Sequence, residues 1–275
     1  MTSLGEQSLF SSNRRKKRFC QTNGILEKTD VLFKRKYGQD NRKHEVVKRM
    51  IQAATAPIVA GLFYLYIRDK YEKEPWRMLV WGILFGVYAT FVIYGAGLWL
   101  ERTFPHPETP LYTSFVSSAL VEEAVKFLFV YALISRNPQF NEPFDAIVYA
   151  VFLSLGFAWI ENMVYVTHPI WGGYGTALSR AVISVPGHGL FGVQMGYWLA
   201  RWRFCRQSHA RTFAFLLPYC YHSVFNFLLL QKMPGDLALF LGLQVWLWID
   251  GLRKMRRLLE LSPFRPKREK SSVKW

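Results

Sequence analysis

Apolar residues in this chain are gathered into long blocks that are separated by short polar loops. Most of the blocks run for about 17 to 24 residues, which is the length of helix that spans a bilayer. The sequence therefore predicts an all-α fold, a polytopic transmembrane helical bundle of about seven spans. The predicted spans cover residues 51–67, 78–100, 111–134, 144–167, 177–200, 212–230 and 237–249.

Two basic regions flank the apolar blocks and set the domain organisation. Residues 1–49 hold 13 Lys and Arg against five Asp and Glu, and nine more Lys and Arg follow Asp250. We expect a basic N-terminal tail over 1–49, disordered or lying on a surface, and a transmembrane domain over 50–250. Residues 251–275 are expected to form a basic amphipathic tail that lies along the membrane surface.

The composition agrees with a multi-pass protein of the cell membrane. The chain has 275 residues, is 51% hydrophobic and carries a net charge of +16. Basic tails beside membrane helices are expected to meet anionic lipid, and no nucleic-acid-binding motif accompanies them, so we expect no nucleic-acid partner. The three cysteines show no CxxC spacing and predict neither a disulfide framework nor a zinc knuckle.

The Lys and Arg of the short loops predict an orientation. The loops after the first, third and fifth blocks carry 4, 1 and 4 of these residues, whereas the loops after the second, fourth and sixth carry 1, 0 and 1. The positive-inside rule puts the first set in the cytoplasm, together with the C-terminal tail. This places the basic N-terminal tail outside, unless one block is re-entrant or miscounted.

The stretch "VEEAVKFLFV", residues 121–130, places three charged residues inside a predicted span. Ionisable residues at membrane depth are costly and are functional hypotheses by default. Glu122 and Lys126 are four residues apart, and Glu123 and Lys126 are three apart, so both glutamates lie within reach of the lysine on one helix.

Further polar residues interrupt the later spans at helical spacings. His222 and Asn226 are four residues apart and share a helix face. Tyr165 lies one turn beyond Glu161, and Arg180 lies two turns before the fifth-block histidine. The polar residues of the fourth, fifth and sixth blocks are Asp145, Glu161, Asn162, His188, His222 and Asn226.

Taken singly, each of these residues has an ordinary structural explanation. Glu122 would fit an ion pair that joins helices, and Asn226 would fit an interhelical hydrogen bond. Asp145 would fit a cap at the start of the fourth block. Gly192 and Gly196 have the small-xxx-small spacing of close helix packing, which we favour for them over any chemistry.

Taken together, the polar residues favour a site that activates water. A carboxylate can take a proton from water, and histidine or carboxylate groups can hold a metal or an oxyanion. Lys126 would help to keep one glutamate ionised despite its burial. Asn226 suits a hydrogen-bond donor to a developing oxyanion better than a zinc ligand, and the chain has no HExxH motif.

Four segments, in order, resemble the PrsW family of intramembrane proteases, which is distantly similar to the CAAX-type prenyl endopeptidases. The resemblance covers about residues 50–230, including "YEKEP" after the first block. The four segments are "EEAVK", "FDAIVYAVFLSLGFAWIENMVY", "RAVISVPGHGLFGVQMGY" and "YHSVFN". Two departures stand out: Ala146 and Ala150 occupy positions where the family usually has glycine, and Ser184 replaces the phenylalanine of the prenyl endopeptidases' FxxxH pattern.

The resemblance implies an integral-membrane endopeptidase whose general base is Glu122 or Glu123. His188, His222 and Glu161 would serve as metal ligands, with Lys126 and Asn226 as further catalytic residues and Asn162 and Asp145 as other polar residues of the site. The family is commonly called metalloprotease-like, and we expect a divalent metal, zinc first among the candidates. The alternative without a metal is water activated by glutamate and histidine alone.

The implied substrate is a membrane protein cut in or near its transmembrane segment, such as a membrane-bound regulator of the anti-sigma-factor kind. Two other classes of function stay open. A proton-coupled transporter or channel would also use intramembrane Glu, Lys and His as a relay, although no internal repeat is visible. An inactive scaffold that binds transmembrane helices would keep the fold without cleavage.

Overall fold

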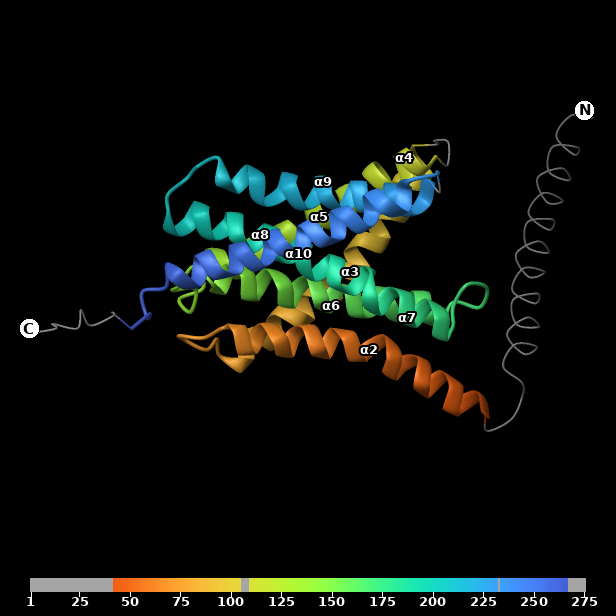
Figure 1. Ribbon diagram of the computed structural model, residues 1–275, viewed down its shortest axis with the longest axis horizontal. Coiled ribbons are helices and arrows are strands. Elements are labelled where there is room, and N and C mark those ends of the chain that lie inside the picture. The colour runs from red at the N-terminus through yellow and green to blue at the C-terminus, as the bar shows by residue number, and fades with distance from the viewer. Residues whose placement is uncertain (1–41, 105–108, 232, 267–275) are drawn as a thin grey trace, which may run out of the picture.

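The computed structural model describes residues 42–104, 109–231 and 233–266, and the regular elements in these ranges are all helical (Figure 1). Most of the long helices run in nearly the same direction as the long axis of the molecule. In chain order they are α2 (Arg42–Arg68), α3 (Trp76–Thr103), α4 (Pro110–Tyr112), the π-helix η1 (Thr113–Leu120), α5 (Val121–Ser135), α6 (Asp145–Thr167), α7 (Tyr174–Val182), α8 (Ser184–Phe204), α9 (Ala210–Gln231) and α10 (Asp236–Glu260).

The prediction of an all-α membrane bundle is confirmed, with differences at particular blocks. Four helical segments are long and apolar enough to cross a membrane, namely Glu45–Arg68, Trp76–Thr103, Asp145–Thr167 and Ala210–Gln231. The predicted fifth block is broken at Ile183 into the short helix α7 and the long helix α8. The predicted third block begins in α4, and η1 and α5 continue from it without interruption.

The two predicted basic tails are partly inside the described ranges. Residues 1–41 and 267–275 lie outside them, whereas residues 42–49 form the first two turns of α2. The stretch after Asp250 continues α10 as one helix to Glu260.

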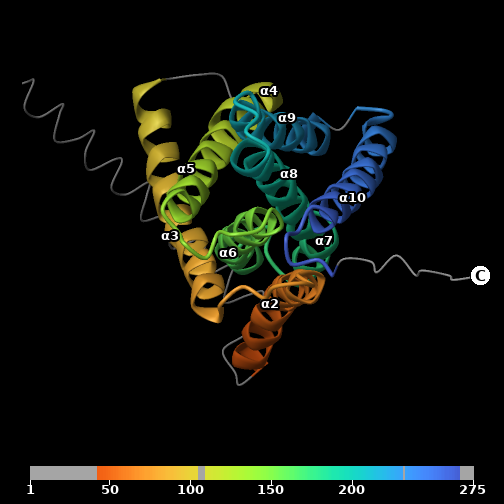
Figure 2. The ribbon, with the colours of Figure 1, turned by 90° about the vertical axis from the view of Figure 1, so that its left-hand side faces the viewer.

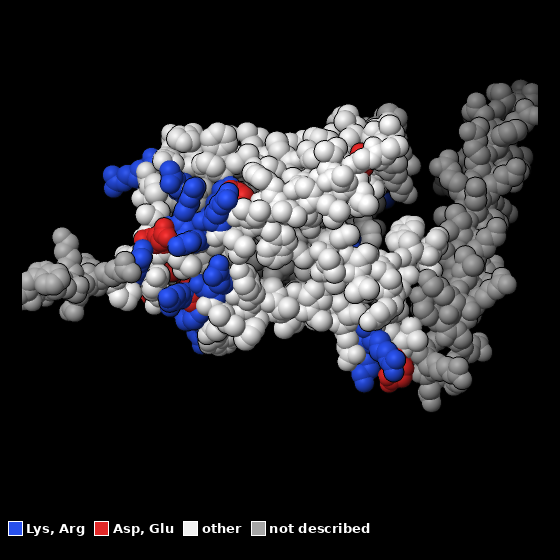
Figure 3. Space-filling model, in the orientation of Figure 1, with Lys and Arg blue, Asp and Glu red and all other residues white. Residues whose placement is uncertain are grey.

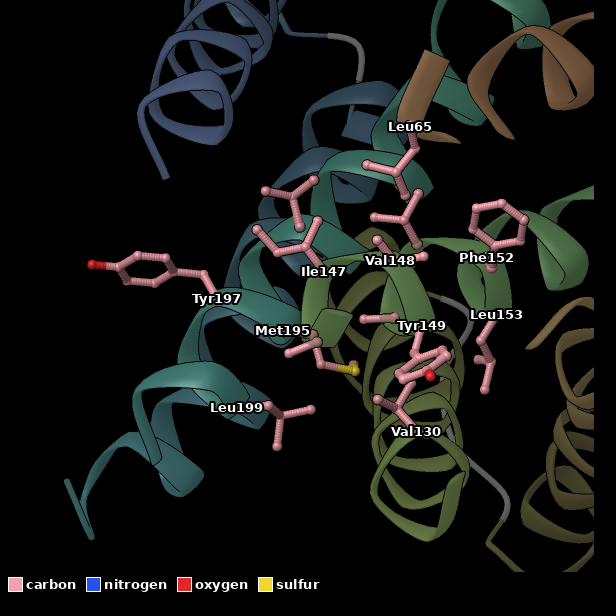
Figure 4. Packing of buried hydrophobic residues seen from close by; sticks show 14 of the residues in the cluster. Leu65, Val130, Ile147, Val148, Tyr149, Phe152, Leu153, Met195, Tyr197 and Leu199 are labelled. Carbon is pink, nitrogen blue, oxygen red and sulfur yellow. The ribbon is translucent and has the colours of Figure 1, made fainter. Parts of the chain in front are cut away.

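Helix α6 lies at the centre of the bundle, with α2, α3, α5 and α8 around it (Figure 2). Every residue from Asp145 to Ala158 is buried. A helix that is apolar all round is expected in such a position. Figure 4 shows Ile147 and Val148 of α6 packed near Met195 of α8.

Small residues allow α6 and α8 to approach closely. A Cβ atom added to Gly196 would lie 2.4 Å from the carbonyl oxygen of Ala146, and one added to Gly192 would lie 3.0 Å from that of Ala150. The packing role predicted for these two glycines is therefore confirmed, and both face the alanines that stand where the family usually has glycine.

Basic side chains are unevenly distributed between the two ends of the bundle. Most of the visible Lys and Arg lie at one end, and a smaller group lies at the start of α2 (Figure 3). The loops that follow α2, α5 and α8 share the more basic end with the end of α10 (Figure 1). The loops that the sequence groups together by charge are thus grouped together in space.

Candidate functional site

Four predicted site residues converge near the end of the bundle that is poorer in charge. Glu122, Glu123, His188 and His222 each offer one potential ligand atom, and these atoms all lie within 4.8 Å of one another. All four side chains are buried. We call these four residues the Glu/His cluster.

Helix α5 supplies the two glutamates and the lysine that compensates their charge. Lys126 Nζ lies 3.1 Å from Glu122 Oε2 and 2.9 Å from Glu123 Oε1. These contacts confirm the pairing expected from the i,i+4 and i,i+3 spacing. The ammonium also lies 4.0 Å from the ring centroid of Phe157 on α6, a cation–π geometry that favours a desolvated cation.

Helix α8 supplies His188 and follows the break at Ile183. His188 Nε2 lies 2.9 Å from Glu161 Oε2, and His188 Nδ1 lies 3.3 Å from Lys126 Nζ. Because the break separates α7 from α8, Arg180 on α7 also reaches Glu161, with Nη2 2.8 Å from Oε2. The imidazole thus lies between the α5 lysine and the α6 carboxylate.

Helix α9 supplies His222 one turn after a proline. His222 Nδ1 lies 2.9 Å from Glu123 Oε1, and its Nε2 lies 3.9 Å from Glu122 Oε2. The imidazole also stacks on Phe191, with a ring-centroid distance of 4.8 Å. Pro218 has no backbone N–H to donate within the helix, so the regular hydrogen-bond ladder of α9 lacks one bond a turn before the histidine.

Asn226 reaches the cluster through a residue that sequence reasoning missed. Its Nδ2 donates to Ser118 Oγ at 3.0 Å, and Ser118 Oγ donates to Glu122 Oε1 at 3.0 Å. The available signal was the spacing, since Ser118 lies four residues before Glu122. Arg180 is the second residue whose contact with the site was not predicted, because the sequence shows only that it lies two turns before His188.

Besides Lys126 and Asn226, three further predicted site residues lie outside the Glu/His cluster. Glu161 contacts His188 and Arg180 but is not one of the four converging ligands. Asn162 donates from Nδ2 to the carbonyl oxygen of Ala54 at 2.8 Å and accepts from Arg180 Nε at 2.8 Å. It therefore ties α6 to α2 and α7.

Asp145 belongs to the opposite end of α6. At the rise of an α-helix, it lies about 24 Å from Glu161 along the axis. Its Oδ2 accepts hydrogen bonds from the backbone N–H groups of Asn141 and Glu142, at 3.0 and 2.8 Å. The carboxylate thus accepts the backbone hydrogen bonds of the loop before α6. This role is close to the capping role expected from the sequence, and Asp145 lies outside the Glu/His cluster.

A cavity of about 270 Å³ opens beside the cluster. A second cavity of about 320 Å³ lies between α3 and α6 and shares Glu122, Glu161 and Tyr165 with the first. The residues that line the first cavity include Ser118, Glu122, Glu161, Arg180, His188, His222 and Asn226.

The Glu/His cluster has the donor set of a divalent-metal site. Two carboxylates and two imidazoles are ligands that zinc accepts in proteins. Glu123 Oε2 is buried and has no hydrogen-bond partner in the described parts of the chain, so it is a free acceptor. The Lys126 ammonium contacts three of the four cluster residues, which means that it already supplies positive charge at the place where a metal would bind.

Comparison with known proteins shows which family the chain belongs to. A family model described as "PrsW family intramembrane metalloprotease" matches residues 74–249, the segment that contains every residue of the cluster. The chain belongs to the PrsW family. The resemblance drawn from the four sequence segments is thereby confirmed, and the chain is a multi-pass intramembrane protease of this family.

Similar proteins agree with the assignment to the PrsW family. The chain is 36% identical to a "Protease PrsW" of Geobacillus kaustophilus over 214 residues, which are 76% of this chain and 91% of the relative. It is 33% identical to proteins of the same name from Clostridioides difficile, over 76% and 91% of the two chains, and Bacillus subtilis, over 76% and 94%. No solved structure matches.

Proposed function

We propose that this chain hydrolyses a peptide bond in or next to the transmembrane segment of a membrane protein, using water activated at the Glu/His cluster. The observation that carries the proposal is the convergence of two glutamates and two histidines from α5, α8 and α9 on one buried point beside a cavity. A membrane-bound regulator such as an anti-sigma factor is the proposed kind of substrate.

Of the two glutamates, Glu122 is the better candidate for the general base. It lines both cavities and keeps 8% of its surface exposed, whereas Glu123 is fully buried. Glu123 instead holds His222 through the 2.9 Å contact with Nδ1. A base must reach the proton that it removes, so the glutamate that faces the cavity is assigned that role.

In the proposed reaction Glu122 first accepts one proton and later returns it. Its carboxylate accepts a proton from water in the cavity while the water oxygen adds to the scissile carbonyl carbon. Asn226, which lines the same cavity, donates to the developing oxyanion. The carboxylic acid then returns the proton to the leaving amine nitrogen as the carbon–nitrogen bond breaks.

We propose that a divalent metal, zinc first among the candidates, is held by His188, His222 and Glu123. Such an ion would supply Lewis-acid chemistry and a more acidic water molecule. Glu161 would orient His188 through the Nε2 contact at 2.9 Å, as a carboxylate does for a metal-binding histidine. Glu161 is thus proposed as a positioning residue and no longer as a ligand.

The cavity between α3 and α6 is the proposed route for the substrate. Its lining is mostly apolar, as the transmembrane segment of a substrate requires, and it ends at Glu122 and Glu161. The other expected partners are anionic lipids at the basic ends of the chain, and no nucleic acid is expected.

The test uses purified protein in liposomes with a panel of single-pass membrane proteins. We compare the wild type with Glu122→Gln, Glu123→Gln and His188→Ala, each before and after a strong chelator. Glu101→Gln is the matched control, because Glu101 is an exposed carboxylate in the last turn of α3 that lines neither cavity. We expect cleavage to fall by about 100-fold or more in the first three variants and to persist in the control.

The chelator decides between the two ways of activating water. Loss of cleavage on chelation, with recovery on adding the metal, supports the metal-dependent site. Cleavage that does not change with the chelator overturns the proposed metal but is consistent with a protease that activates water without one. Proton flux across the liposome that the same substitutions abolish, with no cleavage of any substrate, overturns the protease in favour of a proton-coupled transporter or channel.

A further inference from the structure

An apolar groove lies between α2 and α10, and none of the residues of the Glu/His cluster lines it. Its volume is about 320 Å³. Helix α2 contributes Pro57, Ala60 and Tyr64, and α10 contributes Trp248 and Met255. The floor is formed by residues of α6, α7 and α8.

A basic cavity of about 610 Å³ lies between the same two helices, nearer the basic end. Glu260 is the single acidic residue in the described lining, and it pairs with Arg256 at 3.3 Å. Five basic residues line the cavity, namely Arg68, Lys70, Arg253, Arg256 and Arg265.

The apolar groove and the basic cavity share the same two helices as walls. On α2, Tyr64 lines the groove and Arg68 lines the basic cavity one turn later. On α10 the two overlap along the helix, because Trp248 and Met255 line the groove and Leu252, which lies between them, lines the basic cavity. A molecule lying along α2 and α10 would therefore place an apolar part in the first and a charged part in the second.

Arg68 shows that the basic cavity has unused donor capacity. Its Nε is buried and has no hydrogen-bond partner within the described ranges. Its guanidinium lies over the ring of Tyr64 at 5.7 Å, which holds it between the groove and the cavity. A buried N–H without a partner is uncommon, and an acceptor bound in the basic cavity would satisfy this one.

We propose that an anionic glycerophospholipid binds along α2 and α10, with an acyl chain in the apolar groove and its phosphate in the basic cavity. The excess of cationic side chains complements the net negative charge of the headgroup. A zwitterionic phospholipid would bring a cationic amine against the same arginines. Free phosphate would leave the apolar groove unfilled, and basic pockets between membrane helices are a recurrent setting for anionic headgroups.

The first test asks whether the basic cavity binds the lipid headgroup, and it counts the lipids retained on detergent-purified full-length protein. Native mass spectrometry and thermal melting compare added phosphatidylglycerol with phosphatidylcholine for the wild type and for Arg253→Gln/Arg256→Gln. Each lost arginine is expected to weaken phosphatidylglycerol binding about fivefold, so the double variant binds roughly 25-fold more weakly. Arg211→Gln, an exposed arginine at the start of α9, removes a charge outside the cavity and should bind as the wild type.

The acyl-chain half is tested with a matched pair on α2. Ala60→Phe fills the apolar groove and should lower phosphatidylglycerol binding, while Val59→Phe, an exposed neighbour that does not line the groove, should leave it unchanged. A melting temperature near that of the wild type shows that each variant is folded. Equal retention of the two lipids, unchanged binding in the arginine and Ala60 variants, or equal stabilisation by inorganic phosphate alone would each overturn the proposal.

Discussion

Among the described residues, Lys126 is the only lysine or arginine that forms an ion pair with the carboxylates of the Glu/His cluster, and it pairs with both of them. Its Nζ contacts Glu122, Glu123 and His188, and its side chain is 1% exposed. Removing one partner from a buried ion pair leaves an uncompensated charge, which usually costs about 3–5 kcal/mol. The lysine therefore couples the stability of the fold to the charge of the site.

We predict that Lys126→Met lowers the thermal stability of the protein, and that a divalent metal restores much of the loss. The metal would replace the missing positive charge between the two carboxylates. Melting curves with and without added zinc measure both effects. Lys254→Met is the matched control, because Lys254 is a buried lysine that pairs with Asp250 at 2.7 Å on α10, far from the cluster; its loss should not be rescued by metal. Equal rescue of both variants would contradict the prediction.

Arg180 acts on the site through another residue, since it contacts Glu161 and Asn162 but none of the cluster residues in the contacts described. We predict that Arg180→Gln reduces cleavage or metal affinity by about 10–100-fold, the usual effect of disturbing a group that orients a metal ligand. Metal content measured beside cleavage separates this from simple unfolding. Arg180→Lys should recover part of the activity because it keeps the positive charge beside Glu161. If Arg180→Gln kept the cleavage rate and metal content of the wild type, Arg180 would have no positioning role at the site.

At the scale of single residues, spacing predicted the contacts within one helix and could not predict those between helices. Glu122 and Glu123 lie near Lys126 because helix geometry fixes i,i+3 and i,i+4 neighbours. The contact between Glu123 and His222 spans 99 residues of sequence, and no local pattern encodes it. Residue type alone pointed to the four residues that converge, whereas Asp145 shares their chemistry but lies at the opposite end of α6.

At the scale of helices, the crossing of α6 and α8 depends on the absence of a side chain. We predict that Gly196→Ala destabilises the protein by about 1–3 kcal/mol, the usual cost of overpacking. The added methyl group would lie 2.4 Å from the carbonyl oxygen of Ala146 and 2.5 Å from the Cα of Ile147, and backbone atoms cannot rotate away. The melting temperature in detergent measures the effect.

Gly242→Ala is the control for that substitution. Gly242 lies on α10 and has no neighbouring atom within 4 Å of an added Cβ among the described residues. Alanine is a better helix former than glycine, so stability should be unchanged or slightly raised. A similar loss in both variants would mean that helix propensity, and not the α6–α8 contact, explains the result.

The sequence predicted the number and approximate bounds of the long helices because apolar length is a local property. It missed the break at Ile183, since apolar residues continue across it from Ala177 to Ala200 and Pro186 lies three residues later. A proline is tolerated in the first turn of a new helix, and here it marks that start. The continuation of α10 to Glu260 was missed for the opposite reason, because its basic residues suggested a separate surface segment.

At the scale of the whole molecule, one end of the bundle carries buried carboxyl groups as well as basic residues. Burial raises the pKa of Glu74 to about 7 and that of Asp69 to about 6. The Tyr149 hydroxyl donates to Glu74, and Asp69 Oδ2 accepts from the Glu74 backbone N–H at 3.1 Å. Both groups lie in the loop between α2 and α3.

We predict that stability falls as the pH rises from 5 to 8. Between its ordinary pKa of 4.5 and the raised value of about 7, Glu74 binds a proton in the folded state that the unfolded chain has released. The free energy of unfolding therefore decreases with pH across this window. Melting temperatures at several pH values measure the slope, and Glu74→Gln should make it shallower while Glu101→Gln should not. A slope that is unchanged in Glu74→Gln would contradict the assignment.

The contacts of α5 also constrain how the chain is made. A charged residue at the centre of a lone membrane helix costs about 2.5–3.5 kcal/mol, and α5 carries three of them in 15 residues. Their partners His188 and His222 come 62 and 99 residues later than the residues that they contact. At about 5–20 residues per second, the ribosome needs roughly 5–20 s to reach His222 after it has made Glu123. During that time α5 has only its own Lys126 to pair with Glu122 and Glu123. We therefore expect α5 to reach its stable place in the membrane only after α8 and α9 have been translated.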